Sequence, residues 1–352
     1  MVVSICRISL ASIVQSVVNT RAIWWSRGTA LSCFPRLLPS LWREATPSVL
    51  PTTTTQDRPT MQDFTAQPSP DFAGRHALVY GGGKGIGRAI ALEFARRGAQ
   101  VAVADIDRKA ARECAAAARE FGVAALDVHC DVTDAESVRA AAQAAEDTGA
   151  VDLVVNNVGA IISGHPEDIP LSEWQRILDL NLMPVIHSND VFLPRLLERG
   201  AGHIVNTASF AGLFPYALNR MPYVAAKAAV IALSESLALY CEPRGVRVSC
   251  FCPGPVATEV LAGMRSWTED AVMCGPGSQY ELILPDAAAR TLAEGMLAGR
   301  IMIPTHTAAW EDVRAHAADP DAYLRRRMAA LAEGDPGLPQ VSEALRQSLR
   351  GK

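Results

Sequence analysis

The sequence predicts an α/β fold built on a parallel sheet with helices on both faces. From about residue 75 onwards, short apolar runs alternate with longer helix-like segments, and this alternation is typical of parallel α/β sheets. The runs HALVY and VDLVV are largely apolar rather than alternating, which indicates strands covered on both sides. A glycine-rich stretch joins the first run to the first helix-like segment, as expected where a strand turns sharply into a helix.

The elements can be assigned in chain order from these patterns. The expected strands are His76–Tyr80, Gln100–Ala104, Val123–Cys130, Val151–Val155, His203–Thr207, Val246–Cys252 and Arg300–Pro304. The expected helices are Ile86–Arg97, Arg108–Phe121, Asp134–Asp147, Leu171–Arg199, Pro222–Glu242 and Pro285–Ala298. The helix from Leu171 is long enough to be kinked at Pro184.

Composition and charge exclude several classes of function. Of the 352 residues 49% are hydrophobic, and the net charge is −4, so neither a basic field for nucleic acid nor a nucleic-acid partner is expected. The eight cysteines include no Cys-x-x-Cys pair, and the seven histidines show no metal-ligand spacing. We therefore expect reduced thiols and no metal site.

The amino-terminal region differs from the rest of the chain. Residues 1–60 contain six arginines, no lysine and two acids, which leaves a charge of −8 on the remainder. Their apolar run is too short to span a membrane, and no membrane partner is expected. An Arg-rich, acid-poor start is typical of a mitochondrial transit peptide; the alternative is an unused upstream start, with Met61 as the first residue.

The chain divides into three parts on these grounds. Residues 1–72 are expected to be an extension and linker, 73–305 the α/β domain, and 306–352 a helical tail. Within the domain, residues 258–284 are apolar with a Gly-Pro-Gly centre, which suggests either a lid over a site or ordinary core packing. Phe210, Leu213, Phe214 and Tyr216 are candidates to line the same pocket.

The glycine-rich turn is a candidate phosphate-binding site. Gly81, Gly83, Gly85 and Gly87 surround Lys84 and Ile86 between the first strand and the first helix, where backbone amides and a helix N-terminus favour a pyrophosphate. Alone, such a turn also suits any tight strand-to-helix connection. Asp105 ends the second strand, where an acid binds adenosine ribose hydroxyls; the alternative for Asp105 is a solvated helix cap.

A second group has the residue types that proton transfer needs. Tyr223 and Lys227 lie four apart at a helix start and therefore share one face. Ser209 ends the fifth strand, at the edge where open α/β sheets bind ligands. Tyrosine, with a reference pKa of about 10, is a weak base near neutrality, and a neighbouring ammonium lowers that pKa. An exposed Tyr–Lys pair without function is the competing interpretation.

Together these motifs make the chain resemble the short-chain dehydrogenase/reductase family, in its compact single-domain branch. The resemblance covers roughly residues 71–305 and rests on motifs that occur in the family's order. They are the three glycines Gly81, Gly85 and Gly87, then Cys130–Thr133, Asn156–Gly159, Asn181, Ser209, the pair Tyr223 and Lys227, and Pro253–Thr258. Two departures are Tyr80 where threonine is usual and Val158 where alanine is usual.

The resemblance implies a three-layer, Rossmann-type fold with about seven strands in the order 3-2-1-4-5-6-7. It also implies that Tyr223 is the general acid/base, that Lys227 binds the nicotinamide ribose and lowers the Tyr223 pKa, that Ser209 orients the substrate and that Asn181 holds a relay water. The expected cofactor contacts are Gly81, Gly83, Lys84, Gly85, Ile86, Gly87, Asp105, Asp131, Val132, Asn157, Gly159, Tyr223, Lys227, Pro253, Gly254, Val256 and Thr258.

The predicted function is hydride transfer between NAD(H) and a small alcohol or ketone, hydrophobic in character. Asp105 favours NAD because a carboxylate repels a 2′-phosphate, whereas Lys84 is typical of NADP binding; an NADP-dependent ketone reductase is thus the alternative. A nucleotide-binding regulator without turnover, and a lyase or epimerase with tightly held NAD, are further alternatives. The resemblance also implies a homotetramer or homodimer, and the expected location is cytoplasmic, or mitochondrial if the extension is a transit peptide.

Overall fold

The computed structural model describes residues 71–258, 264–269, 271–343 and 345–346. Of the predicted extension 1–72, only Asp71 and Phe72 fall inside these ranges. In the predicted lid, residues 259–263 and 270 lie outside them.

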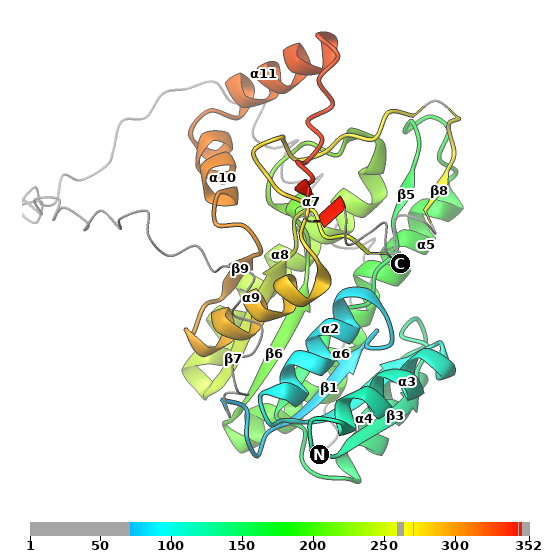
Figure 1. The fold of residues 1–352 in the computed structure, drawn as a ribbon, viewed down its shortest axis with the longest axis vertical. Coiled ribbons are helices and arrows are strands. Elements are labelled where there is room, and N and C mark those ends of the chain that lie inside the picture. The colour runs from blue at the N-terminus through cyan, green and yellow to red at the C-terminus, as the bar shows by residue number, and fades with distance from the viewer. Residues whose placement is uncertain (1–70, 259–263, 270, 344, 347–352) are drawn as a thin grey trace, which may run out of the picture. The chain divides into compact units, whose positions relative to one another are not determined.

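A seven-stranded sheet forms the centre of the domain (Figure 1). Its strands are β1 (His76–Tyr80), β2 (Gln100–Asp105), β3 (Ala125–His129), β4 (Leu153–Asn156), β6 (Gly202–Thr207), β7 (Val246–Cys252) and β9 (Met302–Pro304). All pairings are parallel, and the spatial order is β3-β2-β1-β4-β6-β7-β9. The predicted doubly wound sheet and its strand order are confirmed.

Two sets of helices cover the two faces of this sheet. On one face lie α2 (Gly85–Arg96), α3 (Arg108–Arg119) and α9 (Pro285–Leu297). On the other lie α4 (Ala135–Glu146), α6 (Met183–Arg199) and α8 (Met221–Cys241). The order of the strands reverses between β1 and β4, so this point is the switch where such sheets bind ligands.

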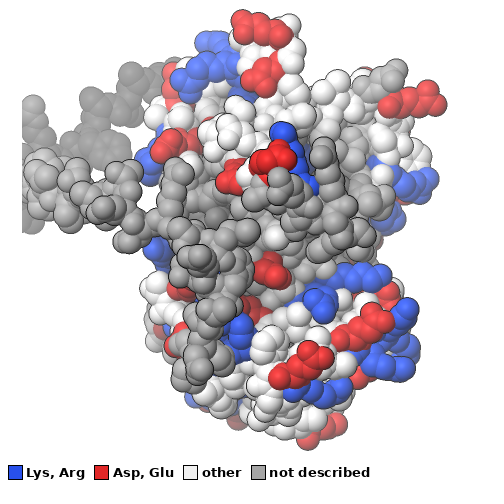
Figure 2. Space-filling model, in the orientation of Figure 1, with Lys and Arg blue, Asp and Glu red and all other residues white. Residues whose placement is uncertain are grey.

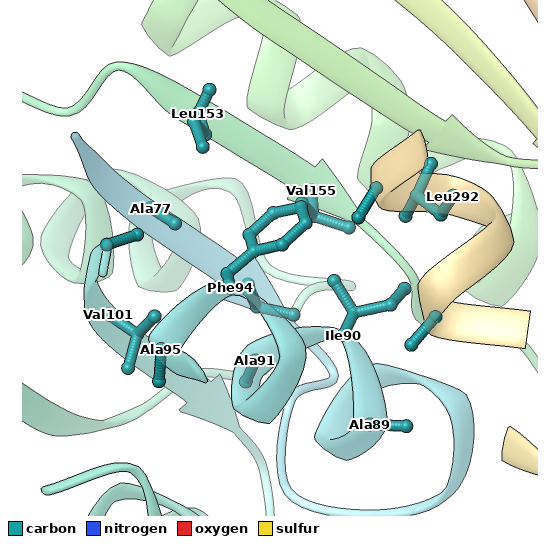
Figure 3. Close-up of a cluster of buried hydrophobic side chains, with 14 of the residues drawn as sticks. Ala77, Ala89, Ile90, Ala91, Phe94, Ala95, Val101, Leu153, Val155 and Leu292 are labelled. Carbon is teal, nitrogen blue, oxygen red and sulfur yellow. The ribbon is translucent and has the colours of Figure 1, made fainter. Parts of the chain in front are cut away.

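Successive side chains of each strand point to opposite faces of the sheet, so the buried residues form two core clusters, one on each face. In Figure 3, Phe94 of α2 lies against Val155 of β4 and near Leu292 of α9. The neighbours Leu78 and Tyr80 on β1 point to the opposite face. Tyr80 is buried, and its hydroxyl donates to the carbonyl oxygen of Val138 in α4 at 3.2 Å. The tyrosine in place of the usual threonine therefore fastens α4 to β1.

The long helix expected over Leu171–Arg199 is wrong in one respect. It is two helices, α5 (Leu171–Asn181) and α6, separated at Leu182 rather than kinked at Pro184. Proline has no N–H and is tolerated in a first helical turn, so Pro184 falls just inside α6. The break places Asn181 at the end of α5, next to the site described below.

A two-stranded sheet that the sequence patterns did not predict lies beside the main one. It pairs β5 (Ile162–Ser163) with β8 (Arg265–Ser266). The tail contains α10 (Ala309–Ala318) and α11 (Pro320–Ala332), which contact each other. Figure 1 shows both in orange, beyond α9.

One helical stretch, Leu218–Arg244, is long and apolar enough to cross a membrane by length and composition. It contains α8, which contacts α5, α7 (Phe210–Leu213) and β7. Its buried residues include Lys227 and Ser234. A helix with a buried ammonium facing a parallel sheet is a core helix of the domain.

Candidate active site

The predicted site residues meet in one cleft at the carboxyl ends of β1, β4, β6 and β7. The cleft has a volume of about 700 Å³. Sixteen of the predicted residues line it: Gly81, Lys84, Gly85, Ile86, Asp105, Asp131, Val132, Asn157, Gly159, Ser209, Tyr223, Lys227, Pro253, Gly254, Val256 and Thr258. The other three, Gly83, Gly87 and Asn181, are not among the residues that line it.

The glycine turn is shaped to bring backbone close to a ligand. Gly81 and Gly85 have φ angles of +69° and +53°, which favour glycine. A Cβ on Gly87 would lie 1.9 Å from the Gly81 carbonyl oxygen, so only glycine lets α2 begin this near β1. Among the described side chains none caps α2. Its first N–H groups are therefore available to an anion in the cleft.

Asp105 and Lys84 have separate partners. The Asp105 carboxylate accepts hydrogen bonds from the backbone N–H of Gly83 at 2.9 Å and of Asp107 at 3.0 Å. Asp107, not Asp105, caps α3, and it forms an ion pair with Lys84 at 2.7 Å. Asp105 is thus free of the capping role and faces the cleft beside the glycine turn.

The next two strand ends complete this half of the cleft. The Asp131 carboxylate accepts from the backbone N–H and hydroxyl of Thr133, and these bonds hold its pKa below the usual range. Val132 is buried beside it. The side chain of Asn157 lies 3.4 Å from both the Gly81 carbonyl oxygen and the Thr207 hydroxyl. It therefore links the ends of β1 and β6 across the switch point.

Ser209, Tyr223 and Lys227 form a buried polar group at the other half. Ser209 hydrogen-bonds the phenolic oxygen of Tyr223, and its Oγ accepts from Ala211 N at 3.2 Å. Lys227 Nζ lies 5.7 Å from the centre of the Tyr223 ring and donates to the Thr207 carbonyl oxygen at 2.8 Å. Burial raises the pKa of Tyr223, and it lowers the pKa of Lys227 to about 8.

Asn181 is close to this group but not in the cleft wall. Its Nδ2 donates to the carbonyl oxygens of Ile177 and Ala160, both at 2.9 Å. Its Oδ1 is buried without a hydrogen-bond partner among the described residues. A Cβ on Gly159 would lie 2.7 Å from that oxygen and 3.3 Å from Lys227 Nζ. The backbone of Gly159 therefore lies between the Asn181 side chain and the Lys227 ammonium, close to both.

The segment Pro253–Thr258, which follows β7, forms the roof of the cleft near Tyr223. Gly254 N donates to the Thr305 hydroxyl at 2.8 Å. Ala257 N donates to the Ile283 carbonyl oxygen at 2.8 Å. These bonds hold Pro253–Thr258 over the cleft, and Thr258 lies within 4 Å of a Cβ built on Gly85. The glycine turn and the roof thus face each other.

Comparison with known proteins agrees with this geometry. Residues 75–269 match the model of the short chain dehydrogenase family. The chain belongs to the short-chain dehydrogenase/reductase family.

Three relatives place the chain within the family. It is 36% identical over 194 residues to 2,5-dichloro-2,5-cyclohexadiene-1,4-diol dehydrogenase LinX of Sphingobium indicum, covering 55% of this chain and 77% of that one. It is 38% identical over 186 residues to the probable oxidoreductase EphD of Mycobacterium tuberculosis, covering 52% and 31%. The match thus spans about a third of the length of EphD. A short-chain dehydrogenase/reductase from Burkholderia phymatum in complex with NAD superposes with a TM-score of 0.63 at 30% identity, covering 72% and 96%.

The wall at the Tyr223 end differs from the sequence expectation for this short-chain dehydrogenase. Of the four loop residues expected to line it, only Tyr216 does. Phe210 and Phe214 instead pack with Tyr280 and His306 in an aromatic cluster, and Leu213 packs against that cluster. Apolar character predicted burial correctly, but it does not distinguish a cleft wall from the core behind it.

Some lining residues lie in predicted segments without having been named as contacts: Cys130, Val158 and Pro255 in the motifs, and Cys274, Gly275, Pro276 and Leu282 in the predicted lid. Others lie outside both the predicted motifs and the predicted lid. They are Ile106, Ile161, Leu180, Thr207, Ala208, Arg220, Leu338 and Pro339. Thr207 and Ala208 could be found from their position at the end of β6. Leu338 and Pro339 reach the cleft because Gln340 pairs with residues 280–282, a long-range pairing without a local signal.

Charges on the outer surface are mixed. On the face drawn in Figure 2, basic and acidic side chains of the described residues are interspersed and form no field of one sign. Among the residues that the structure describes, no group of three or more His, Cys, Asp or Glu side chains is placed to hold a metal ion.

Proposed function

We propose that the protein is an NAD-dependent oxidoreductase that transfers hydride between NAD(H) and an alcohol or ketone. The observation that carries this is the joint presence, in one cleft, of the glycine turn and the Ser209–Tyr223–Lys227 group. The relatives named above as dehydrogenases, and a neighbour solved with NAD, support the same activity and cofactor class.

The described residues fit a dinucleotide. The close approach at Gly81 and Gly87 and the uncapped start of α2 suit a pyrophosphate. Asp105 suits the adenosine ribose, with Asp131 and Val132 beside the adenine. Tyr223, Lys227 and the roof Pro253–Thr258 suit the nicotinamide end, where the bound dinucleotide would supply or accept the hydride.

The chain's own residues handle the proton. Tyr223 exchanges a proton with the substrate oxygen, and Ser209 donates a hydrogen bond to that oxygen as charge develops on it. Burial raises the pKa of Tyr223, and the hydrogen bond with Ser209 and the charge of Arg220 lower it. The ammonium of Lys227, 5.7 Å from the ring centre, is placed to add to this lowering. The unpartnered Oδ1 of Asn181, beside Lys227, suits a water that passes the proton outwards.

Apolar residues around Tyr223 favour a hydrophobic substrate. Ile161, Leu180, Met273 and Leu282 line this end of the cleft.

The proposal includes self-association through α6 and α8, because Leu239 of α8 is 82% exposed and Tyr240 is 54% exposed. It also keeps a cytoplasmic location, or a mitochondrial one if residues 1–60 act as a transit peptide.

Substitution of Tyr223 by Phe tests the proposal. It removes one hydroxyl, so turnover should fall by about 10²–10⁴-fold, while NADH binding persists. Activity is measured at 340 nm with NAD or NADP against a panel of cyclic and linear alcohols and ketones. Protein that binds NADH but turns over nothing on this panel would favour a regulator. Substantial activity in Tyr223→Phe would contradict the role of the phenol.

A further inference from the structure

A buried arginine lies at the substrate end of the cleft, and the proposed chemistry involves it only through its charge, which lowers the pKa of Tyr223. Arg220 is 9% exposed and lines the cleft three residues before Tyr223. Its guanidinium donates to the Cys274 carbonyl oxygen and lies over the Tyr216 ring, 5.5 Å from the ring centre. It also hydrogen-bonds the Tyr216 hydroxyl.

No carboxylate of the described residues pairs with this charge. Within the described ranges, the ion pairs do not include Arg220. Asp105 and Asp131 are the acids among the described cleft-lining residues. Asp105 ends β2 and Asp131 follows β3, so both lie at the adenosine end. The other cation near Tyr223 is Lys227. The described residues that line the substrate half of the cleft therefore carry a net positive charge.

The position of Arg220 adds to this imbalance. It immediately precedes α8, at the N-cap, where the helix dipole is positive and a cation is disfavoured. Burying a guanidinium without a counter-charge costs several kcal/mol. A carbonyl and a hydroxyl satisfy some of its five N–H donors but supply no negative charge. Such a residue is stabilised when an anion enters the cleft.

A second arginine holds the same stretch of wall from behind. Arg327 of α11 donates to the Gly275 carbonyl oxygen at 3.0 Å, and it does not line the cleft. Cys274 and Gly275 are thus held by two cations, one on each side. Because only Arg220 faces the cleft, the two side chains separate anchoring of the wall from contact with a ligand.

We propose that Arg220 binds a carboxylate on the substrate, so that the enzyme acts on hydrophobic hydroxy acids or oxo acids. The planar guanidinium suits a carboxylate because two parallel N–H groups reach both oxygens. The carboxylate takes no part in the transfer of hydride or proton; it fixes the position of the alcohol or ketone at Tyr223. This inference rests on the proposed function for the substrate's reacting group only.

A pair of isosteric ligands tests the site without turnover. Binding of cyclohexanecarboxylate and of cyclohexanecarboxamide to the full chain saturated with NAD⁺ is measured by calorimetry. We expect the wild type to bind the carboxylate at least tenfold more tightly. Since hydrogen bonds to charged groups contribute about 1.5–3 kcal/mol, Arg220→Gln should weaken carboxylate binding by about 10–100-fold and remove the preference over the amide.

Two further variants distinguish loss of the contact with the ligand from loosening of the cleft wall. Arg220→Lys retains the charge and should keep part of the preference for the carboxylate. Arg327→Gln loosens the same wall without touching the cleft and should keep the preference entire. Equal binding of the two ligands by the wild type, or an unchanged preference in Arg220→Gln, would overturn the proposal, and so would a preference lost in Arg327→Gln.

Turnover separates this inference from the proposed function. Reduction of 4-oxocyclohexanecarboxylate and of its methyl ester by NADH is followed at 340 nm, and the acid should have the lower KM. Turnover of both at equal KM would contradict the carboxylate site and leave the oxidoreductase standing. A carboxylate preference in binding without turnover of any alcohol or ketone would leave the Arg220 site standing and contradict the oxidoreductase.

Discussion

At the scale of single residues, Lys227 combines burial with charge. It is 3% exposed, and its ammonium has one hydrogen-bond acceptor among the described residues, the Thr207 carbonyl oxygen. Burial favours the neutral amine and lowers the pKa of Lys227 from 10.5 to about 8. The site therefore holds an ammonium that is poised to release its proton just above neutral pH.

This shift predicts a pH-dependent stability. Between pH 8 and 10.5 the unfolded chain still binds the proton that the folded protein has released, so the free energy of unfolding rises with pH. The cost of burying the ammonium is fully present below pH 8 and disappears above pH 10.5. The free energy of unfolding of Lys227→Met, taken relative to that of the wild type, should be higher at pH 7.5 than at pH 10.5 by about 3 kcal/mol. Urea unfolding of the protein without cofactor at both pH values measures this, and a pH-independent difference would contradict it.

Asp105 determines the choice of dinucleotide in this proposal. Its carboxylate is fixed by two backbone N–H groups, so it cannot turn away from a 2′-phosphate. Asp105→Ala removes this repulsion and should lower the ratio of kcat/KM for NAD to that for NADP by tenfold or more. Lys84→Met is the matched variant, and it should lower kcat/KM for NADP without lowering kcat/KM for NAD. An unchanged ratio in Asp105→Ala would mean that Lys84 or another group determines the preference between NAD and NADP.

At the scale of elements, the relation between α7 and α8 sets the distance from Ser209 to Tyr223. Ser209 caps α7, and Tyr223 lies in the first turns of α8. Between them, Gly212 packs directly on the α8 backbone: a Cβ there would lie 2.6 Å from the Lys227 carbonyl carbon. The two helices can approach this closely only because residue 212 has no side chain.

Gly212→Ala should therefore move α7 and draw Ser209 away from Tyr223. We expect kcat to fall by about 10²-fold, because a displacement of about 1 Å in a site has this effect, with NADH affinity retained. Gly295→Ala, which crowds Ile303 between α9 and β9, is the control: overpacking should destabilise it by about 1–3 kcal/mol without the loss in kcat. Equal loss of kcat in both variants would contradict the geometric explanation.

Most elements and their order followed from local patterns in the sequence. The glycine turn, the strand ends at Asp105 and Ser209, and the pair Tyr223 and Lys227 are encoded within a few residues each. The break at Leu182 and the exclusion of Phe210 and Phe214 from the cleft depend on tertiary contacts. Arg220 carried a local signal, a cation at a helix start. Its burial, and the absence of an acidic partner among the residues that the structure describes, depend on the tertiary structure.

At the scale of the whole molecule, the tail forms part of the cleft wall through Leu338 and Pro339. Gly275 N donates to the Pro336 carbonyl oxygen at 2.9 Å, and Leu282 N and Gln340 N form bonds of 2.7 Å with Gln340 and Tyr280. Asp312 accepts from the hydroxyls of Tyr280 and Tyr323, which joins α10 and α11 to the same segment. Residues 272–284 are thus held from the carboxyl-terminal side.

A chain that ends at Glu333 should keep the sheet and bind NADH as before. It lacks Leu338 and Pro339 and the backbone bonds to Gly275, Tyr280 and Leu282, so we expect KM for a ketone substrate to rise at least tenfold. A chain that ends at Arg346 retains these contacts and should behave as the full protein. An unchanged KM in the shorter chain would show that the tail does not form the substrate wall.

The origin of that wall affects how the enzyme should be compared with its relatives. The match to the family model ends at residue 269, whereas Met273, Leu282, Leu338 and Pro339 on the wall all lie beyond it. On the proposed function, the shared region thus encodes the reaction, and the last quarter of the chain encodes which molecule undergoes it. Proteins with the same substrate should be recognised by Arg220 together with residues 271–340, even when others are more alike over the dinucleotide half.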